Sequence, residues 1–186
     1  MKEMVSHALK QKLAINFIWT HKKFKRILIG DSTQFELPPL FKKIYKGSGG
    51  AASPSSIKVQ YCFDLISASI VSLVNRSGVA TDYSSEICFL EKNDLIIEDL
   101  GYFNIDRFKQ IAKRRAYFLS RFRFGRVVFK KHKDEYVAID LLKEEKKMKS
   151  GEIRQFQVWI DRKEKLPVRL ILEKVPDQIS DQKGEN

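Results

Sequence analysis

Two short apolar runs in this chain each lead directly into an aspartate. The first run, 27–30, precedes Asp31, and the second, 94–98, precedes Asp99. Compact apolar runs of this length are typical of interior strands. Ligands of open α/β sheets bind beyond the carboxyl ends of the strands, so we expect both carboxylates at one end of a sheet. There they could seat divalent cations, which prefer oxygen ligands. Taken singly, either aspartate could instead stabilise a turn.

The composition narrows the class of partner. With 186 residues and 43% hydrophobic side chains, the chain can bury one ordinary core. Lys and Arg number 35 against 23 Asp and Glu, a net charge of +12, which favours a polyanion such as nucleic acid. For a carboxylate site in such a chain we expect a phosphodiester substrate. Two cysteines and three histidines without ligand spacing argue against a disulfide scaffold or a zinc site.

The sequence shows no membrane-spanning run. Its longest nearly apolar stretch, 66–74, is about half of what a bilayer requires. Lys10 and Lys12 interrupt the segment in which a signal-peptide core would lie. We therefore expect a cytoplasmic protein associated with DNA and with no membrane.

The first half of the chain is predicted to hold one helix, a loop and several strands. Residues 1–23 form an N-terminal helical segment, because apolar residues recur there at four-residue spacing. Residues 47–56 are rich in Gly and Ser and are expected to form a flexible loop, since the Lys-Ser/Thr ending of a nucleotide-binding loop is missing. In 57–64 apolar and polar residues alternate, and the apolar side is expected to be the buried one. Residues 70–74 complete a hairpin, and Asp82 is placed to cap a helix through Leu90.

The second half begins with a helix and continues with strands. Asn104 is placed to cap a helix whose buried stripe holds Ile105, Phe108, Ile111 and Ala112. A strand over 116–120 follows. The strands expected after it are 126–129, 136–141, 153–160 and 168–173, with a charged connection over 143–151. The residues alone thus favour the α/β class, with a mixed sheet flanked by helices.

Several basic residues are candidates for contact with DNA. Arg121 and Arg123 follow the strand over 116–120 and alternate with Phe122 and Phe124, a pattern that suits backbone contact and base stacking. The alternative is that the phenylalanines belong to the core and the arginines are solvated, and we expect this for the phenylalanines. Lys58 and Lys46 complete the set of expected DNA-binding residues.

These segments, in this order, resemble a known family. The stretch 27–33, followed by Leu37-Pro38, 47–50 and 57–60, is similar to the first catalytic block of insertion-sequence transposases. The stretch 95–103, with Phe108, Ile111 and 117–121 downstream, resembles their second block. The similarity is greatest to the bacterial insertion-sequence-four type and covers most of 24–176.

The resemblance implies a fold, a reaction and partners. It implies a ribonuclease-H-like core over 24–124, a β-rich insertion over 125–175 and a polar, disordered tail over 176–186. Asp31 and Asp99 would match the first two acids of an Asp-Asp-Glu triad, which together hold Mg²⁺ or Mn²⁺ for DNA cleavage and strand transfer. The partner would be double-stranded DNA at transposon ends, bound by a homodimer or by a pair with a full-length transposase. Glu98 points to the opposite face of its strand from Asp99 and is given no role.

One part of the family pattern is missing. The third acid of the triad lies in a Tyr, Arg, Glu, Lys signature that follows the insertion, and Glu173 lacks that context. We therefore expect a truncated transposase core that is inactive alone. One alternative is a non-catalytic DNA-binding remnant that regulates or pairs with a full-length transposase. The other is a nuclease with another third acid, for which Asp64 and Glu36 are weak candidates.

Overall fold

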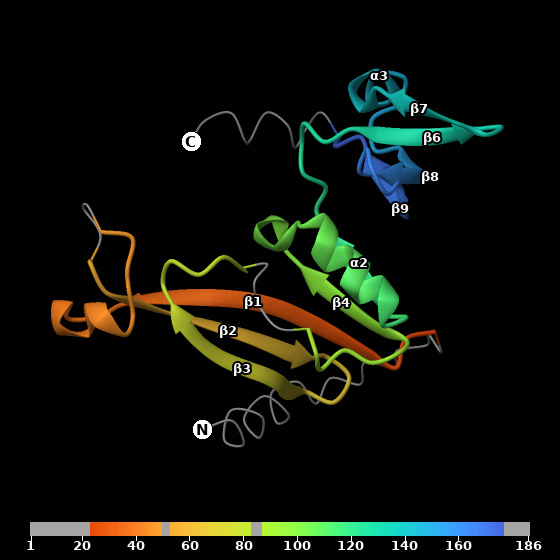
Figure 1. Cartoon of the computed structure of the whole chain (residues 1–186). Coiled ribbons are helices and arrows are strands. Elements are labelled where there is room, and N and C mark those ends of the chain that lie inside the picture. Colours follow the sequence, from red (N-terminus) through yellow and green to blue (C-terminus); the bar gives the residue numbers. More distant parts are fainter. Residues whose placement is uncertain (1–22, 50–52, 83–86, 177–186) are drawn as a thin grey trace. The chain divides into compact units, whose positions relative to one another are not determined.

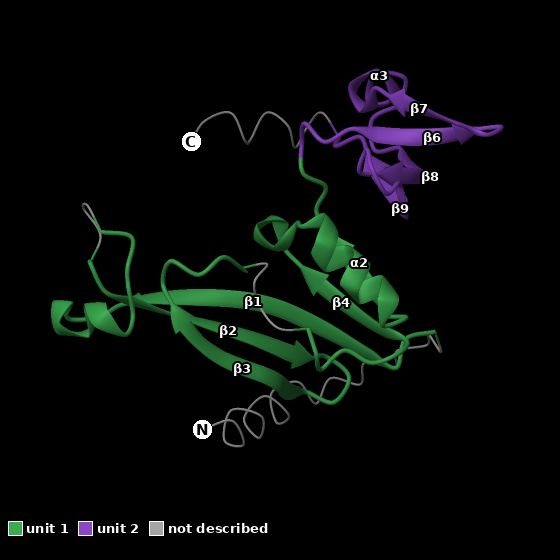
Figure 2. Cartoon of the chain, in the orientation of Figure 1, with its two compact units in different colours: residues 1–123 green, residues 124–186 purple. Residues whose placement is uncertain are grey.

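The computed structural model describes residues 23–49, 53–82 and 87–176. These residues belong to two compact units, 1–123 and 124–186 (Figure 2). The helical segment expected over 1–23 and the tail expected over 176–186 lie outside the described residues, except for residues 23 and 176. Within the described ranges, no helix combines the length and the apolar character needed to cross a membrane.

The first unit is built on a mixed five-stranded sheet (Figure 1). Its strands stand in the order β3-β2-β1-β4-β5, where β1 pairs antiparallel with β2 and parallel with β4. The strands are β1 (Arg26–Glu36), β2 (Ser56–Asp64), β3 (Ser69–Ser77), β4 (Asp94–Glu98) and β5 (Tyr117–Ser120). The 3₁₀ helix η1 (Pro39–Lys43) lies in the β1–β2 connection, and η3 (Leu100–Tyr102) and α2 (Ile105–Lys113) join β4 to β5. The α/β class and the mixed sheet are as expected.

The strand β1 is longer than its apolar run predicts. Its pairing with β4 runs from Arg26 beside Asp94 to Gly30 beside Glu98. Its pairing with β2 continues through Asp31, opposite Tyr61, to Glu36. The expectation that the strand ends before Asp31 is therefore wrong: the run of apolar residues marks only the part that lies between two neighbouring strands.

The alternation predicted for β2 is present, but the buried side is the opposite one. Gln60, Cys62 and Asp64 are buried, whereas Tyr61 and Phe63 are half-buried. The polar side faces the interior because Gln60 and Cys62 line a small pocket with residues of β4 and α2. The polarity of single residues did not reveal this packing.

The helix α2 is capped as predicted, since the Asn104 side chain accepts a hydrogen bond from the backbone N–H of Arg107 at 3.0 Å. Its buried stripe differs from the expected one. Phe108 and Ile111 are buried, but Ala112 is exposed and Arg107 is buried in its place. Phe108 stacks on Phe118 of β5 with ring centroids 4.1 Å apart, so the helix packs against the face of the sheet.

The helix expected after Asp82 falls partly outside the described residues, which omit 83–86. Where the chain is described again, Ile87–Leu90 form a turn, closed by a hydrogen bond from the Leu90 N–H to the Ile87 carbonyl. The Asp82 side chain is bound to Ser32 and Lys58.

The second unit is an antiparallel four-stranded sheet in the order β7-β6-β8-β9. Its strands are β6 (Val128–His132), β7 (Glu135–Ile139), β8 (Ile153–Ile160) and β9 (Leu166–Glu173). The four expected strands are found within a few residues of their predicted bounds. Instead of a plain connection, the segment after β7 contains a short helix, α3 (Leu141–Lys146), capped by the Asp140 side chain.

Candidate functional site

The pairing of β1 with β4 brings the two aspartates of the sequence analysis to neighbouring strands. Gly30 and Glu98 form the last pair of the parallel register; the next residues are Asp31, still on β1, and Asp99, just after the end of β4. Neighbouring strands lie about 4.8 Å apart. Both aspartates are exposed, whereas Gly30 and Glu98 before them are buried. The two carboxylates therefore follow the buried part of the sheet at the same level.

The side chain of Asp31 is held by two hydrogen bonds. One oxygen, Oδ1, accepts from the backbone N–H of Ser32 at 2.7 Å, and the other, Oδ2, accepts from the Tyr61 hydroxyl at 3.2 Å. Burial raises the pKa of Tyr61, and the negative charge of Asp31 raises it further. The tyrosine thus remains a neutral donor that orients the carboxylate.

Asp99 is the N-cap of η3, where its Oδ1 accepts a hydrogen bond from the Gly101 N–H at 2.8 Å. The turn role that the sequence left open is therefore present. It occupies one carboxylate oxygen of an exposed side chain.

The structure adds a third aspartate that sequence reasoning did not place in the site. Asp82 accepts hydrogen bonds from the Ser32 hydroxyl at 2.8 Å and from Lys58 at 3.1 Å, both at Oδ1. A Cβ added to Gly101 would lie 2.9 Å from Oδ2 of Asp82 and 3.1 Å from Oδ1 of Asp99, so these two oxygens surround one point. An alanine there would crowd both carboxylates.

The pKa of Tyr102 also responds to the acidic residues near the site. Burial raises the pKa of the Tyr102 hydroxyl, a hydrogen bond with Ser32 lowers it, and the negative charges of Asp82, Glu98 and Asp31 raise it further. No sequence motif marks Asp82 as a neighbour of β1, because it is 50 positions from Ser32, whose hydroxyl it binds, while Asp31 accepts from the backbone N–H of Ser32.

The donor type of Asp31 and Asp99 fits a hard divalent cation, since both present exposed carboxylate oxygens. The described residues contain no group of three or more His, Cys, Asp or Glu that could hold a metal ion. A cation bound at the two aspartates would therefore need further ligands, such as water or a phosphate oxygen.

An open groove beside the site brings together two of the four expected DNA-binding residues. Lys58 and Arg123 line it with Gln34, Ser48, Asp82 and Gly101. The Lys58 ammonium is bound to Asp82 and to the Ala80 carbonyl, and its side chain is only 13% exposed. Arg121 is exposed just after β5, and Lys46 is exposed in the β1–β2 connection. Neither of these two residues is among those that line the groove.

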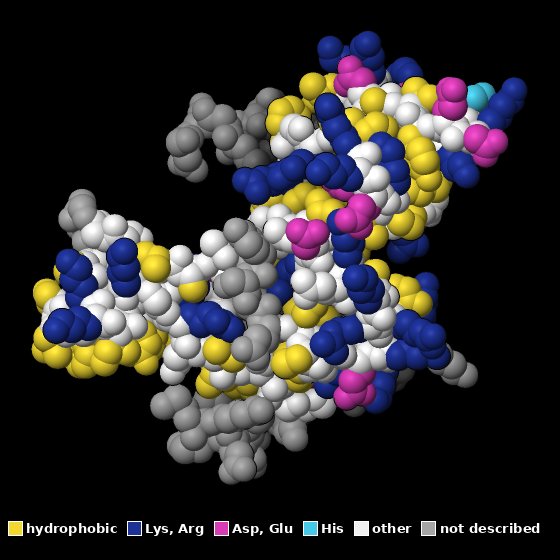
Figure 3. Space-filling view, in the orientation of Figure 1, with side chains coloured by type: hydrophobic (Ala, Val, Ile, Leu, Met, Phe, Trp, Pro, Cys, Tyr) yellow, Lys and Arg dark blue, Asp and Glu magenta, His cyan; other side chains and the backbone are white. Residues whose placement is uncertain are grey.

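The phenylalanines next to these arginines differ from one another. Phe122 packs on Phe103 with ring centroids 5.9 Å apart, but Phe124 is 83% exposed. The expectation that both are core residues is wrong for Phe124. Over the face drawn in Figure 3, Lys and Arg side chains are spread over both units and Asp and Glu are few.

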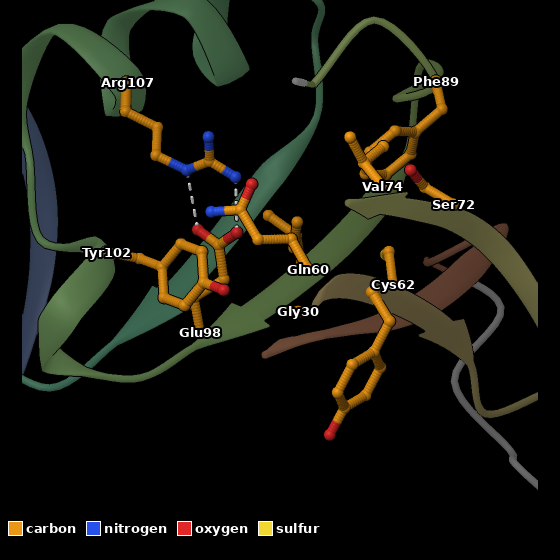
Figure 4. A pocket seen from close by; sticks show the side chains of 11 residues that line it. Gly30, Gln60, Cys62, Ser72, Val74, Phe89, Glu98, Tyr102 and Arg107 are labelled. Atoms are coloured by element: carbon orange, nitrogen blue, oxygen red, sulfur yellow. Dashed lines mark hydrogen bonds and ion pairs between the residues drawn. The ribbon is translucent and has the colours of Figure 1, made fainter. Parts of the chain in front are cut away.

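Below the two aspartates lies a buried ion pair. Glu98 accepts two hydrogen bonds from Arg107, at 3.0 Å from Nε and 2.5 Å from Nη2, and both side chains are about 96% buried (Figure 4). Burial raises the pKa of Glu98, and the bonds from Arg107 act in the opposite direction. Arg107 was not expected here, although its position beside Phe108 on the apolar side of the helix was visible in the sequence.

The other acids weighed as a third ligand lie elsewhere. Asp64 is paired with Leu28 in the register and is bound to the Ser67 hydroxyl, three residues before Asp31 along β1. Glu36 lies five residues beyond Asp31, roughly 16 Å along an extended strand. Glu173 ends β9 of the second unit. Neither Asp64 nor Glu36 lies beside Asp31.

Residues 22–180 match the family model described as transposase DDE domain. Because the match covers more than half of the chain, this chain belongs to the transposase DDE domain family. The chain is also similar to transposases of bacterial insertion sequences. It is 34% identical over 172 residues to the transposase for insertion sequence element IS1151 of Clostridium perfringens, covering 83% of this chain and 36% of that protein.

A second relative gives the same result. Identity to the transposase for insertion sequence element IS231F of Bacillus thuringiensis subsp. israelensis is 30% over 197 residues, covering 94% of this chain and 41% of that protein. The chain thus spans well under half the length of these relatives.

Among solved structures, the chain is similar to a piggyBac transposase in a synaptic complex with hairpin DNA. The TM-score is 0.43 at 12% identity, and the match covers 80% of this chain and 33% of that one. A similarity this low carries no argument about this chain's site.

Proposed function

We propose that this chain is the part of an insertion-sequence transposase that supplies the first two acids of a divalent-metal site for cutting and joining DNA. Asp31 and Asp99 are the catalytic residues and the ligands of Mg²⁺ or Mn²⁺. The observation that supports this most directly is the parallel register of β1 and β4, which puts both aspartates one step beyond Gly30 and Glu98. The strand order is consistent with a ribonuclease-H-like core of the insertion-sequence-four type.

Hydrogen bonds within the chain orient the two carboxylates that would bind the cation. Tyr61 and the Ser32 N–H orient Asp31, and the Gly101 N–H orients Asp99. When bound, a metal pair activates the attacking hydroxyl and stabilises the leaving oxygen during in-line attack on phosphorus. Asp31 lies on β1 and Asp99 lies just after the end of β4. Because both are held by the sheet, the two aspartates approach the DNA backbone in a fixed geometry.

The groove lined by Lys58 and Arg123 is the proposed path of the DNA backbone, and exposed Arg121 and Lys46 add phosphate contacts outside it. Double-stranded DNA at the element's ends is the proposed partner. The Lys58–Asp82 pair means that Lys58 must exchange a carboxylate for a phosphate when DNA binds. Arg121, Arg123, Lys58 and Lys46 are DNA-binding residues in this proposal.

The proposed site is incomplete within the described residues. No group of three or more His, Cys, Asp or Glu there could hold a metal ion, and the relatives are more than twice as long. The third acid therefore comes from the remainder of a full-length transposase, with which this chain pairs, or from a second copy. Alone, the chain binds DNA and metal without cleaving DNA. A remnant that regulates a full-length transposase would share the DNA binding but need no metal.

The test measures Mn²⁺ binding by the full chain with electron paramagnetic resonance. Asp31→Asn and Asp99→Asn are expected to abolish binding. Asp106→Asn, which removes the same charge from an 80% exposed side chain on α2, is expected to leave it unchanged. If the unchanged chain binds no Mn²⁺, or if all three variants behave alike, the proposal is wrong.

DNA binding is tested separately with a labelled duplex. Lys58→Ala and Arg123→Ala should weaken DNA binding and reduce its salt dependence. Lys113→Ala, at an exposed position of α2, should change neither. Metal-dependent nicking of plasmid DNA by the unchanged chain alone would contradict the proposed need for another chain.

A further inference from the structure

The buried Glu98–Arg107 pair stands directly behind the proposed metal ligands. Glu98 precedes Asp99 on β4, and its register partner Gly30 precedes Asp31 on β1. The pair is inside the protein, with side chains 3% and 4% exposed, so it does not touch DNA or a cation directly. Its position nevertheless couples it to both aspartates.

Gly30 and Glu98 are matched to one another. A Cβ added to Gly30 would lie 2.9 Å from Oε1 and 3.2 Å from Cγ of Glu98. The glycine therefore leaves the space that the Glu98 side chain fills on the side of the sheet facing α2. A side chain at position 30 would therefore crowd Glu98 at the last pair before the two aspartates.

Arg107 fixes the other end of the segment that begins at Asp99. The chain leaves β4 at Glu98, forms η3, and returns with α2, whose Arg107 donates two hydrogen bonds back to Glu98. Arg107 also lies over the ring of Tyr102, 5.5 Å from its centroid. In Figure 4 the Arg107 side chain reaches from α2 to the end of β4, where the dashed lines join it to Glu98. The loop that carries Asp99 is thus closed by this ion pair.

The same strands carry a second buried ion pair that serves as a control. Arg26 donates from Nε and Nη2 to Asp94, at 3.0 and 2.5 Å, and the Asp94 side chain is fully buried. Arg26 and Asp94 are also register partners, but they lie four residues before Gly30 and Glu98, about 13 Å along the strands. Both are ion pairs between an arginine and a buried carboxylate, but the Arg26 side chain is 20% exposed and Asp94 lies farther from the two aspartates than Glu98 does.

We propose that Glu98, Arg107 and Gly30 are positioning residues that set the separation of the Asp31 and Asp99 carboxylates and thereby the affinity for the divalent cation. This inference rests on the proposed function. Groups that orient metal ligands without touching the metal change metal affinity by roughly 10- to 100-fold when they are replaced. A pair that only stabilises the fold would not change the affinity of the folded chain.

The experiment compares Mn²⁺ affinity in four full-length variants by electron paramagnetic resonance. Glu98→Gln is expected to weaken binding by about 10-fold or more, and its matched control Asp94→Asn, which removes the same charge, by less than about 2-fold. Gly30→Ala changes no charge and is expected to weaken binding as well. Arg107→Lys keeps the charge but loses the forked geometry, and should have an intermediate effect.

Folding is monitored in each variant, in a Cys88→Ser background, by the protection of the buried Cys62 thiol. If Glu98→Gln fails this check, Gly30→Ala and Arg107→Lys decide the outcome. Equal Mn²⁺ affinity in the folded variants and in Asp94→Asn overturns the positioning role while leaving the metal site intact. If the unchanged chain binds no Mn²⁺, both the proposed function and this inference are wrong.

Discussion

The two units of the chain differ in what they bury. Within the described part of the first unit, seven polar or charged residues are buried beside the apolar core, namely Ser55, Ser56, Gln60, Asp64, Asp94, Glu98 and Arg107. In the described part of the second unit, the buried residues are apolar, namely Val128, Phe129, Met148, Val158, Ile160 and Leu170. The second unit also contains cation–π contacts, such as that of Lys165 over the buried ring of Phe129 at 3.5 Å.

This difference matters because burying charged side chains is energetically unfavourable. A buried charge loses its hydration, and a buried ion pair often recovers only part of that loss. The first unit contains two such ion pairs, Arg26–Asp94 and Glu98–Arg107, one at each end of the β1–β4 pairing. The aspartates follow directly after the end that holds the second pair. The first unit thus buries charged pairs in the segments that lead to the aspartates, whereas the buried residues in the described part of the second unit are apolar.

The largest effect is expected from breaking the buried pair of the first unit. Arg107→Met leaves Glu98 buried without its partner, which should lower the free energy of unfolding by about 3–5 kcal/mol. The change is followed by the exposure of Cys62 in a Cys88→Ser background, because burial raises the pKa of Cys62 to about 12 and keeps the folded thiol unreactive. Lys113→Met, at an exposed position of the same helix, should change stability by less than about 0.5 kcal/mol. A loss as small as that in Arg107→Met would remove the contrast between the units.

A smaller effect is expected from introducing a polar group into the second unit. Val158 is fully buried, and Val158→Thr places a hydroxyl in an apolar interior. We expect a loss of about 1–3 kcal/mol, measured by denaturation with the fluorescence of Trp159. The control is Gln157→Thr at the exposed neighbouring position. Tolerance of threonine at 158 would show that this interior accepts polar groups as readily as the first one.

Removing a surface cation of the second unit should cost less. Lys165 lies over the rings of Phe129 and Tyr136. Lys165→Met removes both contacts and should destabilise the unit by roughly 0.5–1 kcal/mol, again followed through Trp159. Lys163→Met at a nearby exposed position provides the baseline. An effect as large as that of Arg107→Met would mean that cation–π contacts match a buried ion pair.

The smallest expected change is local and concerns Tyr61. Burial raises the pKa of this tyrosine above its usual value of 10.0, and the charge of Asp31 adds to the rise. Asp31→Asn should therefore lower the pKa of Tyr61 but leave it above 10.0, because burial remains. Tyrosine ring NMR over an alkaline titration measures this shift, with Asp106→Asn as the control. An unchanged Tyr61 pKa would mean that Asp31 is not held against Tyr61 in solution.

Much of the fold was predictable because local patterns specify local structure. The compact run 94–98 gave β4 at its observed bounds, and Asn104 gave the start of α2. The alternation of 57–64 gave β2 but not its buried side. Which side of a strand is buried depends on what packs against it, and here Gln60 and Cys62 face residues of β4 and α2.

The sequence by itself determined that Asp31 and Asp99 each follow a mostly apolar run, because strand segments between two neighbouring strands bury most of their side chains. Only the tertiary structure decided that Asp82 binds the Ser32 hydroxyl and lies with Asp99 beside Gly101, and that Arg107 turns inward to Glu98, which fills the space left by Gly30. These contacts join residues from different elements. Their geometry depends on strand order and register, which no local pattern encodes.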